Sequence, residues 1–124
     1  MQKVTGIGGV FFRARDPKTL SDWYERNLGV DILDKTWVQE SGQTVFAPFK
    51  MDSEYFGRAE QQWMICFRVA DLDAMVAQLK ANGIKAIQKD EWNSEVGTFA
   101  HIHDPEGNPI ELWQPSEQSA TVGG

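Results

Sequence analysis

Cysteine is almost absent from this chain of 124 residues, because Cys66 is the only one. A single thiol cannot form an intramolecular disulfide, and it excludes a zinc site built on several cysteines. A chain of this length buries roughly two-thirds of its unfolded surface, so it can fold without either device. The lack of disulfides is typical of a reducing compartment, which predicts a cytoplasmic protein.

Long apolar runs and an excess of basic residues are also missing. No stretch approaches the roughly 18 consecutive apolar residues that a membrane helix needs, and residues 1–13 lack the pattern of a signal peptide. Lysine and arginine number 12 against 18 acidic residues, which gives a net charge of −6. Nucleic acids and anionic membranes both attract a basic surface. The composition therefore predicts neither as a partner.

The first half of the chain predicts a strand, a helix and a hairpin. The apolar run at residues 7–14 indicates the strand, and Asp16 followed by Pro17 is typical of a helix start. Gly29 is expected to end that helix. Two further strands and a polar linker are then expected at residues 30–38, 44–49 and 50–62, and a short strand around 55–56 is one option within the linker.

The second half repeats this order of elements. A strand is predicted at 64–69, and Asp71 is expected to cap a helix that ends at Asn82–Gly83. Further strands are expected at 84–87, 98–103 and 109–113, the last two joined by a turn at 104–108. When the halves are overlaid, Phe12 meets Phe67 and Asp16 meets Asp71. Since neither half is large enough to bury its own sheet, the two are predicted to pack together.

Two segments carry a resemblance to a known family. One is DPEGNPIEL at residues 104–112, and the other is VFFRARDP at residues 10–17, followed by Trp23–Tyr24 and Leu28–Gly29. Over about residues 6–115 the chain resembles the vicinal oxygen chelate superfamily, which includes glyoxalase I, the bleomycin-resistance proteins and the extradiol dioxygenases. The resemblance implies an α+β fold in which two βαβββ modules form curved mixed sheets around an open cup. It places one domain at 1–116, with modules at about 6–57 and 62–115 and a flexible tail at 117–124.

The resemblance also draws attention to a metal site. In the metal-using members a glutamate on the last strand is one ligand, and Glu111 matches that position. The two other usual ligand positions correspond to Gly9 and Met64, neither of which suits a hard divalent ion. The site is therefore predicted to be degenerate, and glyoxalase I activity is not expected.

His101 is the residue most closely associated with Glu111. If residues 105–107 form the tip of the turn, His101 lies directly across from Glu111, and both side chains point to the same face of the sheet. Three interpretations stay open. The pair holds a divalent metal such as zinc, iron, nickel or manganese; Glu111 accepts a hydrogen bond from His101 or Arg13 in a satisfied polar core; or the two residues act as an acid–base pair.

Alternation along the strands predicts an apolar and polarizable lining for the cup, which suits a hydrophobic or aromatic small molecule. Trp92, in the polar loop 90–96, is a candidate for a lid or a partner contact. The candidate ligand-binding residues are Phe11, Arg13, Trp37, Met64, Cys66 and Trp113.

The sequence thus predicts a small-molecule-binding protein that forms a homodimer. The alternative is a metal-dependent lyase, isomerase or dioxygenase that uses Glu111 and His101 as catalytic residues and metal ligands. The sequence specifies neither the ligand nor the type of reaction.

Overall fold

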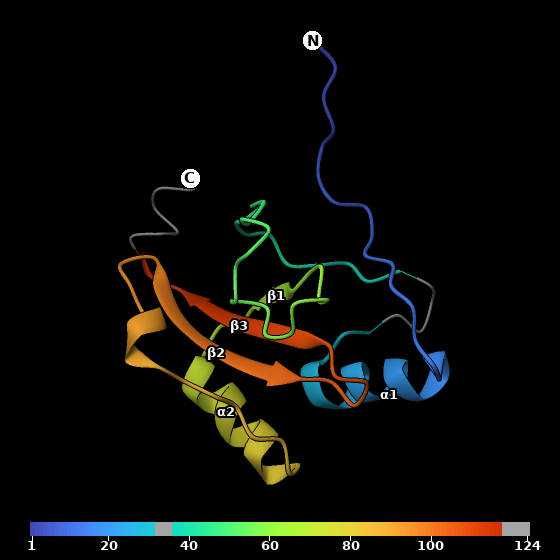
Figure 1. The fold of residues 1–124 in the computed structure, drawn as a ribbon, viewed down its shortest axis with the longest axis vertical. Helices are drawn as coiled ribbons and strands as arrows, with labels where there is room; N and C mark the ends of the chain where they lie inside the picture. The colour runs from blue at the N-terminus through green and yellow to red at the C-terminus, as the bar shows by residue number, and fades with distance from the viewer. Residues whose placement is uncertain (32–35, 118–124) are drawn as a thin grey trace.

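The computed structural model of the protein describes residues 1–31 and 36–117. Over these residues, two α-helices, one short 3-10 helix and three strands follow one another along the chain, and Figure 1 labels them where there is room. In chain order they are α1 (Pro17–Leu28), β1 (Ile65–Arg68), α2 (Leu72–Ala81), η1 (Asp90–Trp92), β2 (Gly97–His103) and β3 (Pro109–Pro115). Within the described residues, regular structure is therefore concentrated in the second half.

Both α-helices begin where their capping residues predict. The side chains of Asp16 and Asp71 accept hydrogen bonds from first-turn amides of α1 and α2, at 3.1 and 3.0 Å. Pro17 follows Asp16 at a position where an amide hydrogen would lack a helical partner in any case. Gly29 ends α1 with a φ of 72°, a left-handed conformation that glycine adopts without steric cost.

The three strands form one open, curved mixed sheet in the order β1-β3-β2 (Figure 1). The central strand β3 runs parallel to β1 and antiparallel to β2. Glu111 on β3 has Cys66 beside it on one side and His101 on the other. This register confirms the predicted pairing of His101 with Glu111.

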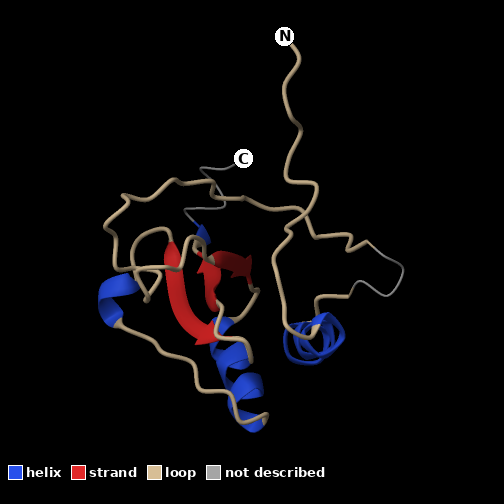
Figure 2. Cartoon of the chain, turned by 45° about the vertical axis from the view of Figure 1, so that its right-hand side comes forward, coloured by secondary structure: helices blue, strands red, loops and turns tan. Residues whose placement is uncertain are grey.

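The core lies between the sheet and the two α-helices. Figures 1 and 2 show α2 packed against one face of the sheet, with α1 beside it. Ile110 and Leu112 point to this face and are fully buried together with Ile102. Burial of one such side chain contributes about 1.5–3 kcal/mol to folding. The remaining core residues are Leu20, Trp23, Tyr24, Leu72, Leu79 and Ala100.

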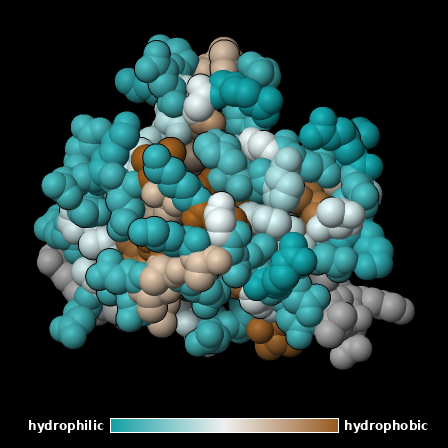
Figure 3. Space-filling view, turned by 90° about the horizontal axis from the view of Figure 1, so that it is seen from below, coloured by the Kyte–Doolittle hydropathy of each residue, from teal (hydrophilic) through white to brown (hydrophobic). Residues whose placement is uncertain are grey.

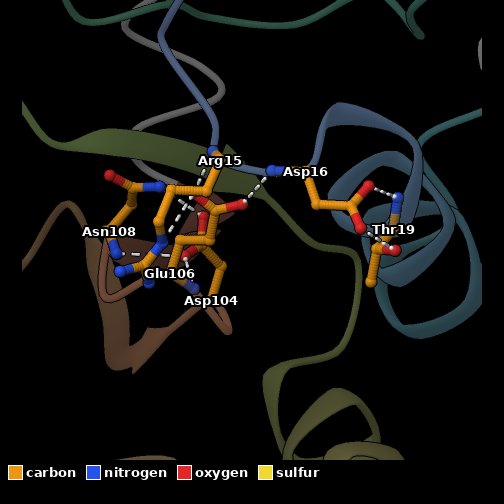
Figure 4. A network of polar contacts seen from close by, with 6 residues as sticks. All are labelled: Arg15, Asp16, Thr19, Asp104, Glu106 and Asn108. Carbon is orange, nitrogen blue, oxygen red and sulfur yellow. Dashed lines mark hydrogen bonds and ion pairs between the residues drawn. The ribbon is translucent and has the colours of Figure 1, made fainter.

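The turn between β2 and β3 is fixed by Asp104. Its carboxylate accepts hydrogen bonds from the amides of Glu106 and Asn108 at 2.8 and 3.0 Å (Figure 4). Glu106 in turn accepts hydrogen bonds from the backbone amides of Arg15 and Asp16, just before α1. The DPEGN motif therefore forms the hairpin turn and also attaches the first helix to it.

Tyr24 makes a second connection between α1 and this turn. Its hydroxyl donates to the buried Asp104 carboxylate at 2.7 Å. Burial raises the pKa of Tyr24, and the hydrogen bond to Asp104 raises it further. The tyrosine thus stays a neutral donor over the whole physiological range.

The predicted strands of the first half were wrong for the residues that the structure describes. Residues 7–14 and 44–49 form no strand, and neither do the described parts of 30–38, of which 32–35 lie outside the description. Phe11, at the centre of the first predicted strand, is 94 % exposed. Apolar alternation marks a segment as suited to a sheet, but a strand forms only where a neighbouring strand pairs with its backbone.

Two smaller predictions also differ from the structure. Residues 84–87 form only an isolated bridge, between Ile87 and His101, and the option of a strand at 55–56 is replaced by turns. Of the two expected modules, only the one at 62–115 has its sheet, while the first contributes its helix. The α+β class and the curved, open mixed sheet agree with the prediction.

The lower face of the molecule is mainly polar. Seen from below in Figure 3, it is mostly hydrophilic, and hydrophobic atoms show in small separate areas. Among the helices of residues 1–31 and 36–117, none combines the length and hydropathy needed to cross a membrane.

Candidate functional site

The face of the sheet opposite the helices borders a cavity of about 1030 Å³, which we call the cup. Residues of β1, β2 and β3 form one wall, and the segments 43–49 and 55–56 form another. Its lining is mainly apolar and includes Met64. It is rich in aromatic rings, namely Phe46, Phe49, Tyr55, Phe56, Trp92, Phe99 and Trp113.

Glu111 is the acidic centre of the cup. The hydroxyl of Tyr55 donates a hydrogen bond to its Oε2 atom, and Nε2 of His101 lies 3.1 Å from the same oxygen. Cys66, on the neighbouring strand, lies beside this carboxylate and helps to lower its pKa. Only 13 % of the Glu111 side chain is exposed, so Tyr55 and His101 replace the water that it loses.

The surroundings of Glu111 keep it ionised. Burial alone raises its pKa, but hydrogen bonds from His101, Tyr55 and Cys66 outweigh burial and bring the pKa below its usual value. The same surroundings raise the pKa values of Tyr55 and Cys66, chiefly by desolvation and then through the negative charge beside them. Although Cys66 is exposed to the cup, its thiol stays protonated and is a poor nucleophile.

Aromatic rings hold His101 in place. The indole of Trp92 stacks on the imidazole, with ring centroids 3.9 Å apart and an angle of 22° between the planes. Tyr55 meets the imidazole edge-on at 5.0 Å. The ammonium of Lys89 lies 5.3 Å from the centroid of Trp92. Trp92, which was a candidate lid, therefore covers the polar centre of the cup.

A family model for the glyoxalase/bleomycin resistance protein/dioxygenase superfamily matches residues 6–112. The chain belongs to this superfamily. The match covers both halves of the sequence, including the first half, whose expected strands are not formed.

Two solved structures show what this superfamily member is similar to. TnmS3, described as an antibiotic binding protein from a Streptomyces species, has a TM-score of 0.62 and 23% identity over 94% of this chain and 100% of its own. A superfamily member from Sphaerobacter thermophilus has a TM-score of 0.47 and 19% identity over 82% of this chain and 90% of its own. A search of curated proteins gives no significant match. At 23% identity the likeness to TnmS3 shows the fold alone.

The metal site of the superfamily does not fit the donors in this chain. Among the described residues there is no group of three or more histidine, cysteine, aspartate or glutamate side chains placed to hold a metal ion. Glu111 and His101 are hydrogen-bonded to each other, and the resemblance to the family assigns Gly9 and Met64, which are poor metal ligands, to the remaining usual positions. This donor set supports no mechanistic step through a metal.

The structure brings most of the predicted site residues together. Glu111, Met64, Cys66 and Trp113 line the cup, and His101 contacts Glu111 there. The other predicted ligand-binding residues lie outside it. Phe11 and Arg13 belong to the exposed N-terminal segment, and Trp37 packs edge-on against Phe67 at 6.0 Å.

Tyr55 is the site residue that the sequence argument missed. It lies in the stretch 50–62, which was interpreted as a polar linker. Two adjacent aromatic residues, Tyr55 and Phe56, in such a polar stretch were the available signal. Nothing in the spacing of these two residues links them to Glu111. The contact of Tyr55 with Glu111 depends on how the loop lies over the sheet, which the folded structure shows.

Proposed function

We propose that the protein binds an apolar or aromatic small molecule in the cup. The observation that carries this proposal is the aromatic lining around one ionised, hydrogen-bonded carboxylate. Cavities that are mainly apolar, with a few convergent polar groups, are typical of small-molecule sites. The description of TnmS3 as an antibiotic binding protein supports the same class of function, with the fold as the only link.

Tryptophan fluorescence tests this proposal directly, because Trp92 and Trp113 line the cup while Trp37 lies outside it. The protein would be titrated with a panel of planar aromatic compounds. We expect saturable quenching that is reduced in Trp92→Phe and kept in the control Trp37→Phe. No response to any compound would contradict the proposal, as would equal loss of quenching in both variants.

The alternative function is a lyase, isomerase or dioxygenase dependent on a divalent metal. The contact between His101 and Glu111 would supply two of the ligands, and the described residues group no third ligand with them. Protein purified without chelators would be analysed for zinc, iron, nickel and manganese. Stoichiometric metal that disappears in Glu111→Gln would support the enzyme. Absence of binding at any added concentration of these metals would contradict it.

We also propose that the protein forms a homodimer. The N-terminal residues 1–14 are extended and carry exposed apolar side chains, including Val4, Ile7, Val10 and Phe11. An extended segment with an unpaired backbone and exposed apolar side chains is a template for pairing with another chain. Light scattering after gel filtration is expected to give the mass of a dimer, reduced toward that of a monomer by Phe11→Asp but unchanged by Lys3→Asp. A monomeric wild type would contradict the proposal.

A further inference from the structure

Tyr55 places a phenol group of the chain itself against Glu111, the carboxylate at the centre of the cup. Its hydroxyl donates to Oε2 of Glu111 and lies 3.1 Å from Nε2 of His101. In the free protein, this carboxylate thus accepts a hydrogen bond from a neutral hydroxyl group. If the cup binds a small molecule as proposed above, this contact indicates the chemical class of that ligand.

The ring of Tyr55 is surrounded by aromatic groups. Phe49 lies at 5.6 Å with an angle of 32° between the rings, and His101 and Trp92 meet the ring edge-on at 5.0 and 6.4 Å. Such offset and edge-on geometries are favourable for aromatic pairs. Together with Glu111 these rings supply every contact that a phenol needs, both an acceptor for its hydroxyl and apolar walls for its ring.

The loop that carries Tyr55 is held together mainly by its own turns. Its backbone hydrogen bonds join Ser53 to Lys50, Gly57 to Glu54 and Gln61 to Arg58, all within the range 50–62. None of these bonds has to break when the Tyr55 side chain leaves Glu111. Removal of Tyr55 from the site therefore costs contacts of the side chain but no strand pairing.

We propose that Glu111, His101 and Trp92 form a site for a phenolic hydroxyl on a planar aromatic ligand, and that Tyr55 fills this site until the ligand replaces it. The ligand donates its hydroxyl hydrogen to Glu111, and its ring takes the place of the Tyr55 ring. A ligand that carries a carboxylate at this point is rejected, because two negative charges would meet in a poorly solvated space.

The variant Tyr55→Ala opens the site, and 4-methylphenol restores the side chain that was removed. We expect 4-methylphenol to bind this variant at least about tenfold more tightly than toluene, since a hydrogen bond to a charged acceptor adds that much or more. Affinity is measured from the rise in melting temperature with ligand concentration. In Tyr55→Ala/Glu111→Gln the preference is expected to shrink to a few-fold.

Phe56→Ala is the matched control on the same loop. Phe56 also lines the cup and packs on Phe49 at 5.1 Å, but it has no hydroxyl. Its removal is expected to create no preference between 4-methylphenol and toluene. Equal binding of both compounds to Tyr55→Ala, or the same preference in Phe56→Ala, would overturn the proposal.

Tyr55→Phe provides a second test that leaves the ring in place. Here 2-naphthol is compared with its methyl ether, 2-methoxynaphthalene, which keeps the rings and lacks the donor. Because the internal hydroxyl no longer competes for Glu111, 2-naphthol is expected to bind about tenfold more tightly than to the wild type, and the ether little differently. An equal gain for both compounds would overturn the proposal.

The binding function and the phenol site can each be wrong independently of the other. If the wild type binds planar aromatic compounds but a hydroxyl makes no difference in any variant, the binding function stands and the phenol site is wrong. If no compound binds the wild type but Tyr55→Ala selects 4-methylphenol, the phenol site stands and the binding function of the native protein is wrong.

Discussion

The two halves of this chain begin alike and end differently. Each half has a helix capped by an aspartate, and Asp16 and Asp71 bond to the first turns of their helices in the same way. Within the described residues only the second half has its sheet, in which α2 carries the chain from β1 to the opposite edge strand β2 and the turn at 104–108 folds β3 back between them. A helix closes its own hydrogen bonds, whereas a strand requires a second strand.

The largest expected effect is on the free energy of unfolding, when one apolar residue from each half is replaced by alanine. Leu112→Ala removes a fully buried side chain beneath the sheet and should lower the free energy of unfolding by about 2–5 kcal/mol. Val38→Ala, at a position that is 90 % exposed in the first half, should change it by less than about 0.5 kcal/mol. Urea denaturation at low protein concentration measures both. Similar losses would show that the first half packs as closely as the second.

The next effect concerns the connection between the halves. Tyr24→Phe removes the hydroxyl that α1 donates to Asp104, and should cost about 1–3 kcal/mol because both groups are buried. A double-mutant cycle with Asp104→Asn separates this contact from the other bonds of the turn. A coupling energy near zero would mean that the Tyr24 hydroxyl does not stabilise the attachment of α1.

A smaller effect tests the likeness of the two helix ends. Gly29 and Gly83 follow α1 and α2 with φ values of 72° and 78°, and a methyl group added at either would meet open space. The only cost of Gly29→Ala or Gly83→Ala is then the left-handed backbone, about 1 kcal/mol each. Thermal denaturation should give nearly equal losses. A much smaller loss for Gly29→Ala would show that α1 contributes less to the folded state than α2.

The sequence predicts those features whose causes are local. The caps of both helices, the hairpin turn at Asp104 and the pairing of His101 with Glu111 follow from residues close together in the chain or from a turn of known length. The strands of the first half and the contact of Tyr55 with Glu111 depend on how distant segments are placed, and no local pattern contains that information. The site residues on the sheet, Glu111 and His101, were therefore predictable, whereas Tyr55 on the loop was not.

The smallest expected effect is on the pH dependence of stability, and it belongs to the second half alone. The pKa of Glu111 is lower in the folded protein than its usual value near 4.5, so the unfolded chain takes up the proton first as the pH falls. The stabilisation is complete above the usual value and disappears as the pH drops through the lowered one. Urea midpoints measured between about pH 6 and pH 3 should therefore fall less steeply in Glu111→Gln than in the wild type. The exposed Glu91 provides the control, and Glu91→Gln should follow the wild-type slope. If Glu111→Gln follows that slope as well, the hydrogen bonds from His101, Tyr55 and Cys66 do not hold the carboxylate ionised in solution.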